Sequence, residues 1–236
     1  MLKALDQRRH IGVRTWAGPS ATLALIFITA TVFVLQNLAD SLGQTAFYPD
    51  FALSVDGLRH GRVWQLLTFQ FLHLPLFAGG AFHLLANLFV IHVFGGTLER
   101  EIGRGALLKL YLLGGMAGGL LQMLGGLLAP EQFGVAVVGA SAGAFALVSA
   151  VATLTPRRRM HLFFLPVPVR ADLLLTLGVT LTLAGLFLPS GHVAHCAHLG
   201  GILTGFFFAR RFRRNGTPAL VGVAAKSSLE IRPIAD

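Results

Sequence analysis

Six stretches of this chain contain no Asp, Glu, Lys or Arg and are each long enough to cross a lipid bilayer as a helix. A hydrocarbon core of roughly 30 Å takes about 17 to 25 helical residues. The stretches are residues 20–38, 81–98, 110–129, 134–155, 173–191 and 192–209. With 54% hydrophobic and only 12% charged residues, the composition is too apolar for a water-soluble domain of 236 residues. The sequence therefore predicts an all-α polytopic membrane protein with six transmembrane helices.

The basic residues of the chain are distributed unevenly between the two sides of this six-span arrangement. A net charge of +9 could indicate a nucleic-acid partner. Short cytoplasmic loops of membrane proteins, however, collect Lys and Arg. Of the 19 Lys and Arg residues, all except Arg59 and Arg62 fall on the side that carries both termini. We therefore expect both termini to be cytoplasmic, and we expect no nucleic-acid partner.

The same pattern divides the chain into three parts. Residues 1–19 are expected to form a cytoplasmic N-terminal segment, residues 20–212 the membrane domain, and residues 213–236 a cytoplasmic tail. The compact form, with no organellar transit peptide evident, favours a bacterial inner membrane. Cys196 is the only cysteine, which excludes an intrachain disulfide and a cysteine-based metal cluster.

Few strongly polar side chains lie inside the predicted spans, and burial there is costly enough to make each a functional candidate. His83 and Asn87 share one face of the second span, Ser141 lies in the fourth, and His198 lies in the sixth. These three spans all begin on the non-cytoplasmic side. At about 1.5 Å of rise per residue, the four side chains lie at similar depths, within roughly 10 Å of that side.

This combination suits nucleophilic hydrolysis, which needs a hydroxyl that attacks, an imidazole that moves its proton and donors for the developing oxyanion. All ten Asp and Glu residues fall outside the spans. A serine hydrolase built from these residues would therefore use a Ser141–His198 dyad without a carboxylate. Small residues at Ala197, Gly201 and Gly205 would let the sixth helix approach the fourth closely, although such spacing is also ordinary membrane packing.

Other readings of these residues fit the sequence less well. The G-x-S-x-G pattern at residues 139–143 occurs in soluble α/β hydrolases, but those need alternating strands and helices. A zinc protease would need H-E-x-x-H, which is absent. The series His192, His195 and His198 is spread over about 120° of a helix, so we expect no metal and no cofactor. A transporter would need buried charges along a path across the bilayer.

From about residue 64 to residue 210 the chain resembles the rhomboid family of intramembrane serine proteases. Four family motifs occur in order on the expected helices. They are H-x-x-x-N at residues 83–87, G-G-x-x-E at 95–99, G-x-S at 139–141 and A-H-x-x-G-x-x-x-G at 197–205. Four motifs in order are far more specific than any one of them.

The resemblance implies a six-helix rhomboid-like bundle that acts as a serine endopeptidase. Ser141 would be the nucleophile and His198 the general base. His83, Asn87 and the backbone N–H of Ser141 would form the oxyanion hole. Rhomboids cleave transmembrane segments of other membrane proteins near the outer face, so the implied partners are single-pass or other transmembrane substrates within the lipid bilayer.

The chain departs from the family pattern at several positions. Gln65 stands where an arginine often helps to fix the first external loop, and Phe145 stands where a tyrosine often stacks on the catalytic imidazole. Ala142 follows the serine where many members have glycine. A non-cleaving relative that binds transmembrane clients is the alternative function. Such relatives usually lose the serine or the histidine, and this chain retains Ser141 and His198.

Overall fold

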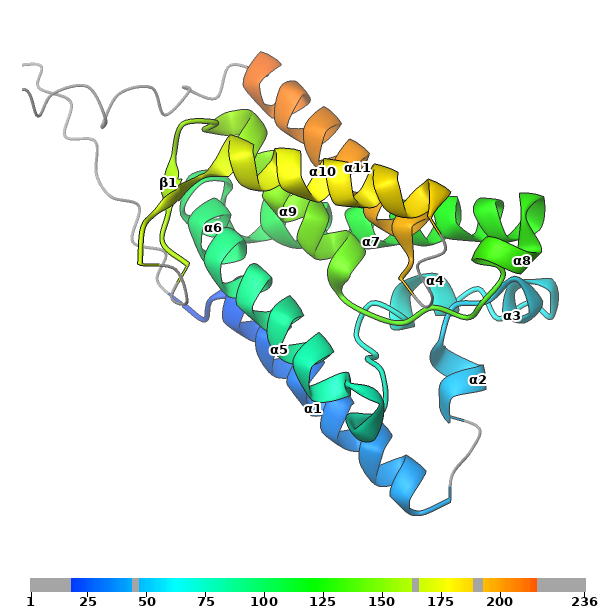
Figure 1. The fold of residues 1–236 in the computed structure, drawn as a ribbon. Coiled ribbons are helices and arrows are strands. Elements are labelled where there is room, and N and C mark those ends of the chain that lie inside the picture. The colour runs from blue at the N-terminus through cyan, green and yellow to red at the C-terminus, as the bar shows by residue number, and fades with distance from the viewer. Residues whose placement is uncertain (1–17, 44–46, 163–165, 189–192, 216–236) are drawn as a thin grey trace, which may run out of the picture.

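A computed structural model describes residues 18–43, 47–162, 166–188 and 193–215, and most of this chain is helical. The longer helices are α1 (Ala21–Ser41), α5 (Gly80–Val90), α7 (Arg104–Leu128), α9 (Ser141–Leu154), α10 (Ala171–Phe187) and α11 (His195–Arg214). The shorter elements are α2 (Phe47–Phe51), α3 (Val55–Arg59), α4 (Gln65–Thr68), η1 (Leu76–Ala78), η2 (Ile91–Gly95), α6 (Gly96–Ile102), α8 (Pro130–Phe133), β1 (Arg159–Met160) and β2 (Val169–Arg170). Figure 1 shows α1 beside α5, with α7, α9, α10 and α11 packed together as a second group.

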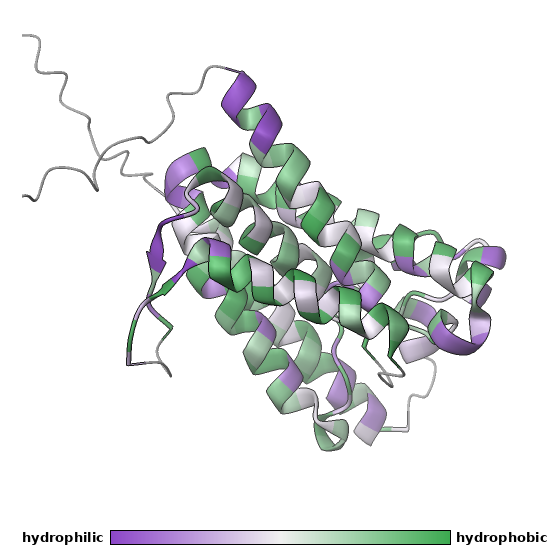
Figure 2. Cartoon of the chain, turned by 45° about the horizontal axis from the view of Figure 1, so that its top comes forward, coloured by the Kyte–Doolittle hydropathy of each residue, from purple (hydrophilic) through white to green (hydrophobic). Residues whose placement is uncertain are grey.

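The predicted membrane bundle is confirmed by these helices. Three described segments are long and apolar enough to cross a membrane, namely Ala21–Ser41, Gly80–Ile102 and Arg104–Leu128. The second of them runs without a break through α5, the π-helical turn η2 and α6. Helices α9 and α10 are apolar but shorter, and α11 ends in a basic turn. Figure 2 shows hydrophobic residues along much of the length of these helices.

The predicted fourth span starts too early, because residues 134–140 form no regular helix and α9 begins only at Ser141. Val137 and Leu53 exchange two backbone hydrogen bonds of 2.8 and 3.0 Å, and the N–H of Gly139 donates to the carbonyl of Phe69 at 2.9 Å. β-branched residues between glycines favour such an extended conformation. The 14 residues of α9 span about 21 Å, less than the roughly 30 Å of the hydrocarbon core. A helix of this length is too short to cross the core by itself, and Ser141 is its first residue.

Small residues allow α11 to pack directly on the backbone of α9. A Cβ atom on Gly201 would collide with the carbonyl of Ala142, and one on Gly205 would collide with that of Ala146. In hydrocarbon, close van der Waals packing of this kind is a main source of helix association. These contacts fix how far apart the two helices lie at the level of the site.

A buried carboxylate joins the N-terminus of α1 to α6. Glu99 accepts hydrogen bonds from the N–H groups of Ala21 and Thr22, at 2.8 and 2.9 Å, and from the hydroxyl of Ser20 at 2.7 Å. The first N–H groups of a helix have no partner within the helix and carry partial positive charge. Glu99 therefore satisfies donors that the membrane could not satisfy.

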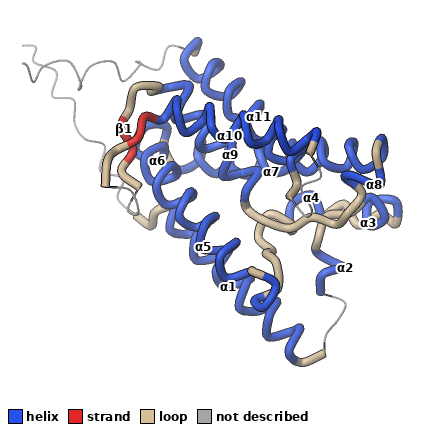
Figure 3. The backbone as a smooth tube through the Cα atoms, in the orientation of Figure 1, coloured by secondary structure: helices blue, strands red, loops and turns tan. Residues whose placement is uncertain are grey.

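One end of the bundle collects most of the described basic residues. The β1–β2 hairpin lies there beside α6, as the tube in Figure 3 shows, and Arg158 forms an ion pair with Glu101. Helix α11 continues to Arg214, so the predicted boundary after residue 212 cuts its last turn. Arg213 donates to the carbonyl of Thr153 near the end of α9 at 3.4 Å. The rest of both predicted cytoplasmic segments, residues 1–17 and 216–236, lies outside the described residues.

The cap on α1 predicts a measurable loss of stability. Replacing Glu99 with Ala leaves buried donors unpaired, and each hydrogen bond to a charged group contributes about 1.5 to 3 kcal/mol. We expect Glu99→Ala to lower the free energy of unfolding in detergent micelles by at least about 2 kcal/mol. Glu131→Ala, at an exposed carboxylate, is the matched control and should change it by less than about 0.5 kcal/mol. Equal stabilities of the two variants would contradict this assignment.

Candidate active site

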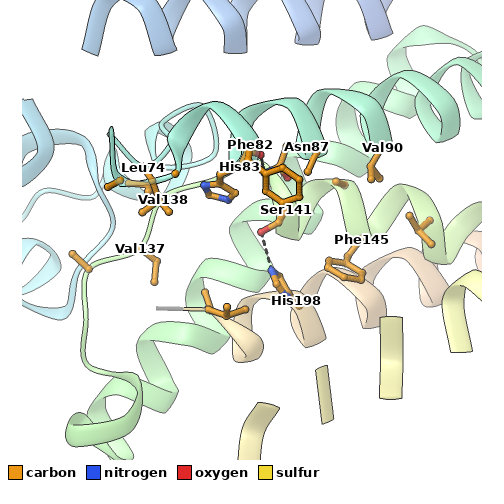
Figure 4. A pocket seen from close by; sticks show the side chains of 18 residues that line it. Leu74, Phe82, His83, Asn87, Val90, Val137, Val138, Ser141, Phe145 and His198 are labelled. Atoms are coloured by element: carbon orange, nitrogen blue, oxygen red, sulfur yellow. Dashed lines mark hydrogen bonds between the residues drawn. The ribbon is translucent and has the colours of Figure 1, made fainter. Parts of the chain in front are cut away.

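Ser141 and His198 come together from two helices that are adjacent in space. Ser141 is the first residue of α9, and His198 lies in the first turn of α11. The Nε2 atom of His198 lies 2.9 Å from the Oγ atom of Ser141, which is hydrogen-bond distance. Figure 4 shows the two side chains pointing toward each other at the pocket. With its proton on Nδ1, the imidazole accepts the hydrogen bond of the serine hydroxyl.

Helix α5 supplies polar groups to the same pocket from another side. His83 and Asn87 line the pocket together with Ser141. The side-chain amide of Asn87 donates to the backbone carbonyl of His83 at 2.9 Å, one turn earlier, and Asn87 is buried. This bond uses one of the two amide hydrogens. The other remains a potential donor at the pocket.

Gly139 places the extended chain against the imidazole of His83. Its φ of +129° is one that residues with a side chain rarely adopt. A Cβ atom here would lie 3.0 Å from the Nε2 atom of His83 and 2.9 Å from Cε1. Glycine is therefore required both by the backbone conformation and by the space that the imidazole occupies.

An aromatic ring supports the imidazole of His198. The rings of Phe145 and His198 lie 4.6 Å apart between centroids, inclined by 37°. On its other side Phe145 contacts α10, where a Cβ atom on Gly178 would lie 2.8 Å from the ring. Phenylalanine thus provides the stacking expected at this position, without a hydroxyl group.

The pocket has a volume of about 560 Å³ and is largely apolar. Besides the polar groups named above, it is lined along α5 by Phe82, Ala86 and Val90 and along α9 by Phe145 and Val148. Along each helix the lining extends over eight residues, from His83 to Val90 and from Ser141 to Val148, which corresponds to a rise of about 10 Å. None of the described residues that line it is acidic.

Gln122 is a buried glutamine that holds segments around the site, and it was not identified from the sequence. Gln122 of α7 donates to the carbonyl of Phe133 at 3.2 Å and accepts from the N–H of Ala197 at 3.3 Å, which anchors the start of α11. The sequence feature that could have indicated this anchoring role is an amide side chain inside an otherwise apolar span. Such a side chain needs partners there, because lipid provides none.

Gln65 fixes the first loop with neutral hydrogen bonds, where the family often has arginine. Its side chain is fully buried, donates to the carbonyl of Pro49 at 2.8 Å and accepts from the N–H of Ser54 at 3.2 Å. Arg62 donates to the same carbonyl at 2.8 Å. The first loop is therefore held in place without the arginine charge.

The other histidines of the sixth span are placed differently from His198. His195 is buried against Gly185 of α10, and its ring lies edge-on to that of His198 with 6.0 Å between centroids. His192 lies outside the described residues. In the described part of the chain, no three His, Cys, Asp or Glu side chains are grouped so that they could hold a metal ion.

Known proteins match this chain over most of its length. The Rhomboid domain family model matches residues 60–215. RHOMBOID-like protein 12, mitochondrial, of Arabidopsis thaliana is 27% identical over 208 residues, covering 81% of this chain and 58% of that protein. RHOMBOID-like protein 1 of Arabidopsis thaliana is 30% identical over 216 residues, covering 81% and 51%. Presenilin-associated rhomboid-like protein, mitochondrial, of Homo sapiens is 28% identical over 144 residues, covering 61% and 36%.

These relatives are longer than the matched region, and the chain spans between 36% and 58% of their lengths. All three come from eukaryotes, so they do not support the expected bacterial inner membrane, which stays a prediction. The family match covers α4 to α11 and includes Ser141, His198, His83 and Asn87. The chain is a membrane protein that belongs to the rhomboid family.

Proposed function

We propose that this chain is an intramembrane serine endopeptidase, which hydrolyses peptide bonds in or near transmembrane segments of membrane proteins through a Ser141–His198 dyad. The observation that carries the proposal is the 2.9 Å separation between Ser141 Oγ and His198 Nε2 in a largely apolar pocket. An activated serine needs a base within this distance. Membership of the family supports the same chemistry.

In the proposed reaction, the Oγ atom of Ser141 attacks the scissile carbonyl while neutral His198 takes its proton at Nε2. His198 then returns the proton to the leaving amine, and water hydrolyses the acyl-enzyme by the same route. None of the described residues that line the pocket is acidic, so none of them supplies a carboxylate to orient the imidazole. The stacked ring of Phe145 and the anchored start of α11 take that role, since both restrict the position of His198.

The oxyanion would be stabilised by His83, Asn87 and the backbone N–H of Ser141. Ser141 is the first residue of α9, where N–H groups have no partner within the helix and carry partial positive charge. Preorganised donors of this kind stabilise charge that develops only in the transition state.

The shape of the pocket suits a transmembrane substrate. Its apolar lining follows α5 and α9 for about 10 Å beyond the dyad, so it can accept a stretch of apolar side chains next to the scissile bond. Phe82 of α5 lines this pocket and is also largely exposed, so lipid and an approaching substrate helix would contact it. Entry from the bilayer keeps the apolar substrate out of water.

The proposal includes an orientation in the membrane. The basic end of the bundle would face the cytoplasm together with residues 1–19 and 213–236, and the membrane domain would be residues 20–212. The active site would then open toward the non-cytoplasmic side. Arg158, Arg170 and Arg213 lie at the basic end, whereas Arg59 and Arg62 lie in the first loop at the other end.

The dyad predicts labelling by a fluorophosphonate probe, which reacts with an activated serine without knowledge of the substrate. Detergent-purified wild type should label, whereas Ser141→Ala and His198→Ala should not, although both should keep the wild-type unfolding temperature to within a few degrees. The readout is in-gel fluorescence next to thermal unfolding. A folded wild type that fails to label would instead favour a non-cleaving protein that binds transmembrane clients.

The oxyanion donors predict a selective loss of turnover. Asn87→Ala should lower kcat for a fluorogenic transmembrane peptide in proteoliposomes by about 10²-fold, the typical effect of removing one such donor. Leu85→Ala, on the exposed face of the same helix, is the matched control and should keep kcat within about twofold. Near-normal turnover by Asn87→Ala would remove this residue from the oxyanion hole.

The stacked ring predicts a smaller, graded effect. Aromatic pairs contribute about 0.5 to 1.5 kcal/mol beyond simple burial, so Phe145→Leu should slow fluorophosphonate labelling by roughly 3- to 10-fold. Phe145→Tyr preserves the ring and should label at nearly the wild-type rate. Phe207→Leu removes an exposed ring from α11 and serves as the control. Equal rates for Phe145→Leu and wild type would show that stacking does not position His198.

A further inference from the structure

His73 is a buried histidine that the proposed reaction does not use. It lies in the first loop, between α4 and η1, with no solvent exposure. Neither of its ring nitrogens has a hydrogen-bond partner among the described residues. Burial and the neighbouring His83 imidazole lower the pKa of His73 to about 4, so the ring is neutral near pH 7. Burying a polar ring without a hydrogen-bond partner costs free energy, so His73 is a candidate for a role in the site.

The ring of His73 packs on the ring of His83. Their centroids are 4.9 Å apart, with the planes inclined by 58°, and Phe33 of α1 meets His73 edge-on with 6.4 Å between centroids. At another part of its ring, His83 meets Gly139, which has no room for a Cβ atom. His83 is therefore confined by His73 and by Gly139, and both contacts act on the ring itself.

The backbone of His73 is held by a glutamine from the first membrane helix. Gln36 accepts from the N–H of His73 at 3.0 Å and donates to its carbonyl at 2.7 Å. The hydroxyl of Tyr48 donates to the same carbonyl at 2.6 Å. Gln36 has no solvent exposure, and both polar atoms of its amide bind His73. Its position in α1 is outside the residues that the family model matches.

We propose that Gln36 and His73 are positioning residues for the oxyanion hole, with Gln36 fixing the backbone of His73 and the His73 ring fixing the orientation of the His83 imidazole. Neither residue touches the reacting atoms. The inference rests on the proposed role of His83 as an oxyanion donor. The χ2 torsion of histidine is broad, so a free imidazole could turn its Nε2 atom away from the pocket. A displacement of about 1 Å in such a site can cost as much as 10²-fold in rate.

The test compares four variants of the full chain in proteoliposomes, with kcat and KM measured for a fluorogenic transmembrane peptide. His73→Ala and Gln36→Leu should lower kcat by about tenfold or more with KM nearly unchanged, whereas His73→Phe restores a ring and should recover most of kcat. Asn37→Leu is the matched control, because Asn37 is the next residue of α1 and accepts from the N–H of Leu76 without binding His73. Its kcat should stay within about twofold of wild type.

A double-mutant cycle separates positioning from general destabilisation. If His73 acts through His83, His73→Ala should have no further effect on kcat in a His83→Ala background. If it merely weakens the fold, the two losses should add. Additive losses, or a change confined to KM, would overturn the proposal.

Nuclear magnetic resonance of protein labelled with ¹⁵N-histidine gives a readout that needs no activity. The ring signals of His83 should shift in His73→Ala and Gln36→Leu and stay in place in Asn37→Leu. Should the wild type prove unable to cleave while these shifts occur, the proposed function fails and the positioning holds. Ring signals of His83 that are unchanged in His73→Ala would overturn the positioning itself.

Discussion

The direct contact between the backbones of α9 and α11 is the constraint on which the site depends. Gly201 and Gly205 lie against the carbonyls of Ala142 and Ala146, so any side chain would force the two helices apart. The Ser141–His198 distance is 2.9 Å. Moving the two helices apart by the width of a methyl group would lengthen it beyond hydrogen-bond distance. Helix α7 packs equally closely on α11, because a Cβ atom on Gly200 would lie 2.6 Å from the Cα atom of Gly118.

The proposed hydrolytic site, placed within the bilayer, would need non-helical chain at membrane depth, where unpaired backbone groups are costly. The segment before Ser141 meets this requirement by hydrogen bonding to the first loop. Val137 pairs with Leu53, and Gly139 donates to Phe69. The first loop is held in turn by Gln65. In the proposed orientation, this chain of contacts would allow α9 to begin below the membrane surface and present its first N–H groups to the pocket.

Hydrophobic length and the spacing of small and polar residues were sufficient to predict the bundle and to select Ser141, His198, His83 and Asn87, which now line one pocket. These features are local patterns within single helices. The start of α9 could not be obtained in this way, because residues 134–140 are as apolar as a helix would be and their pairing partner is more than 60 residues away. Gln36 and Gln122 were missed for the same reason, since an amide inside an apolar span does not reveal which distant backbone it binds.

Helix α1 illustrates how residues outside the family match can shape the site. Glu99 holds its first turn, and Gln36, about 24 Å further along the axis, holds His73. Glu99 and His83 belong to one continuous helical segment, α5 to α6, so α1 is tied directly to one end of this segment and, through the His73 ring, to the other. Because α1 contacts this segment near both of its ends, it limits how far α5 can move relative to the first loop. On this view α1 restrains the proposed oxyanion donor, although it supplies no group to the pocket itself.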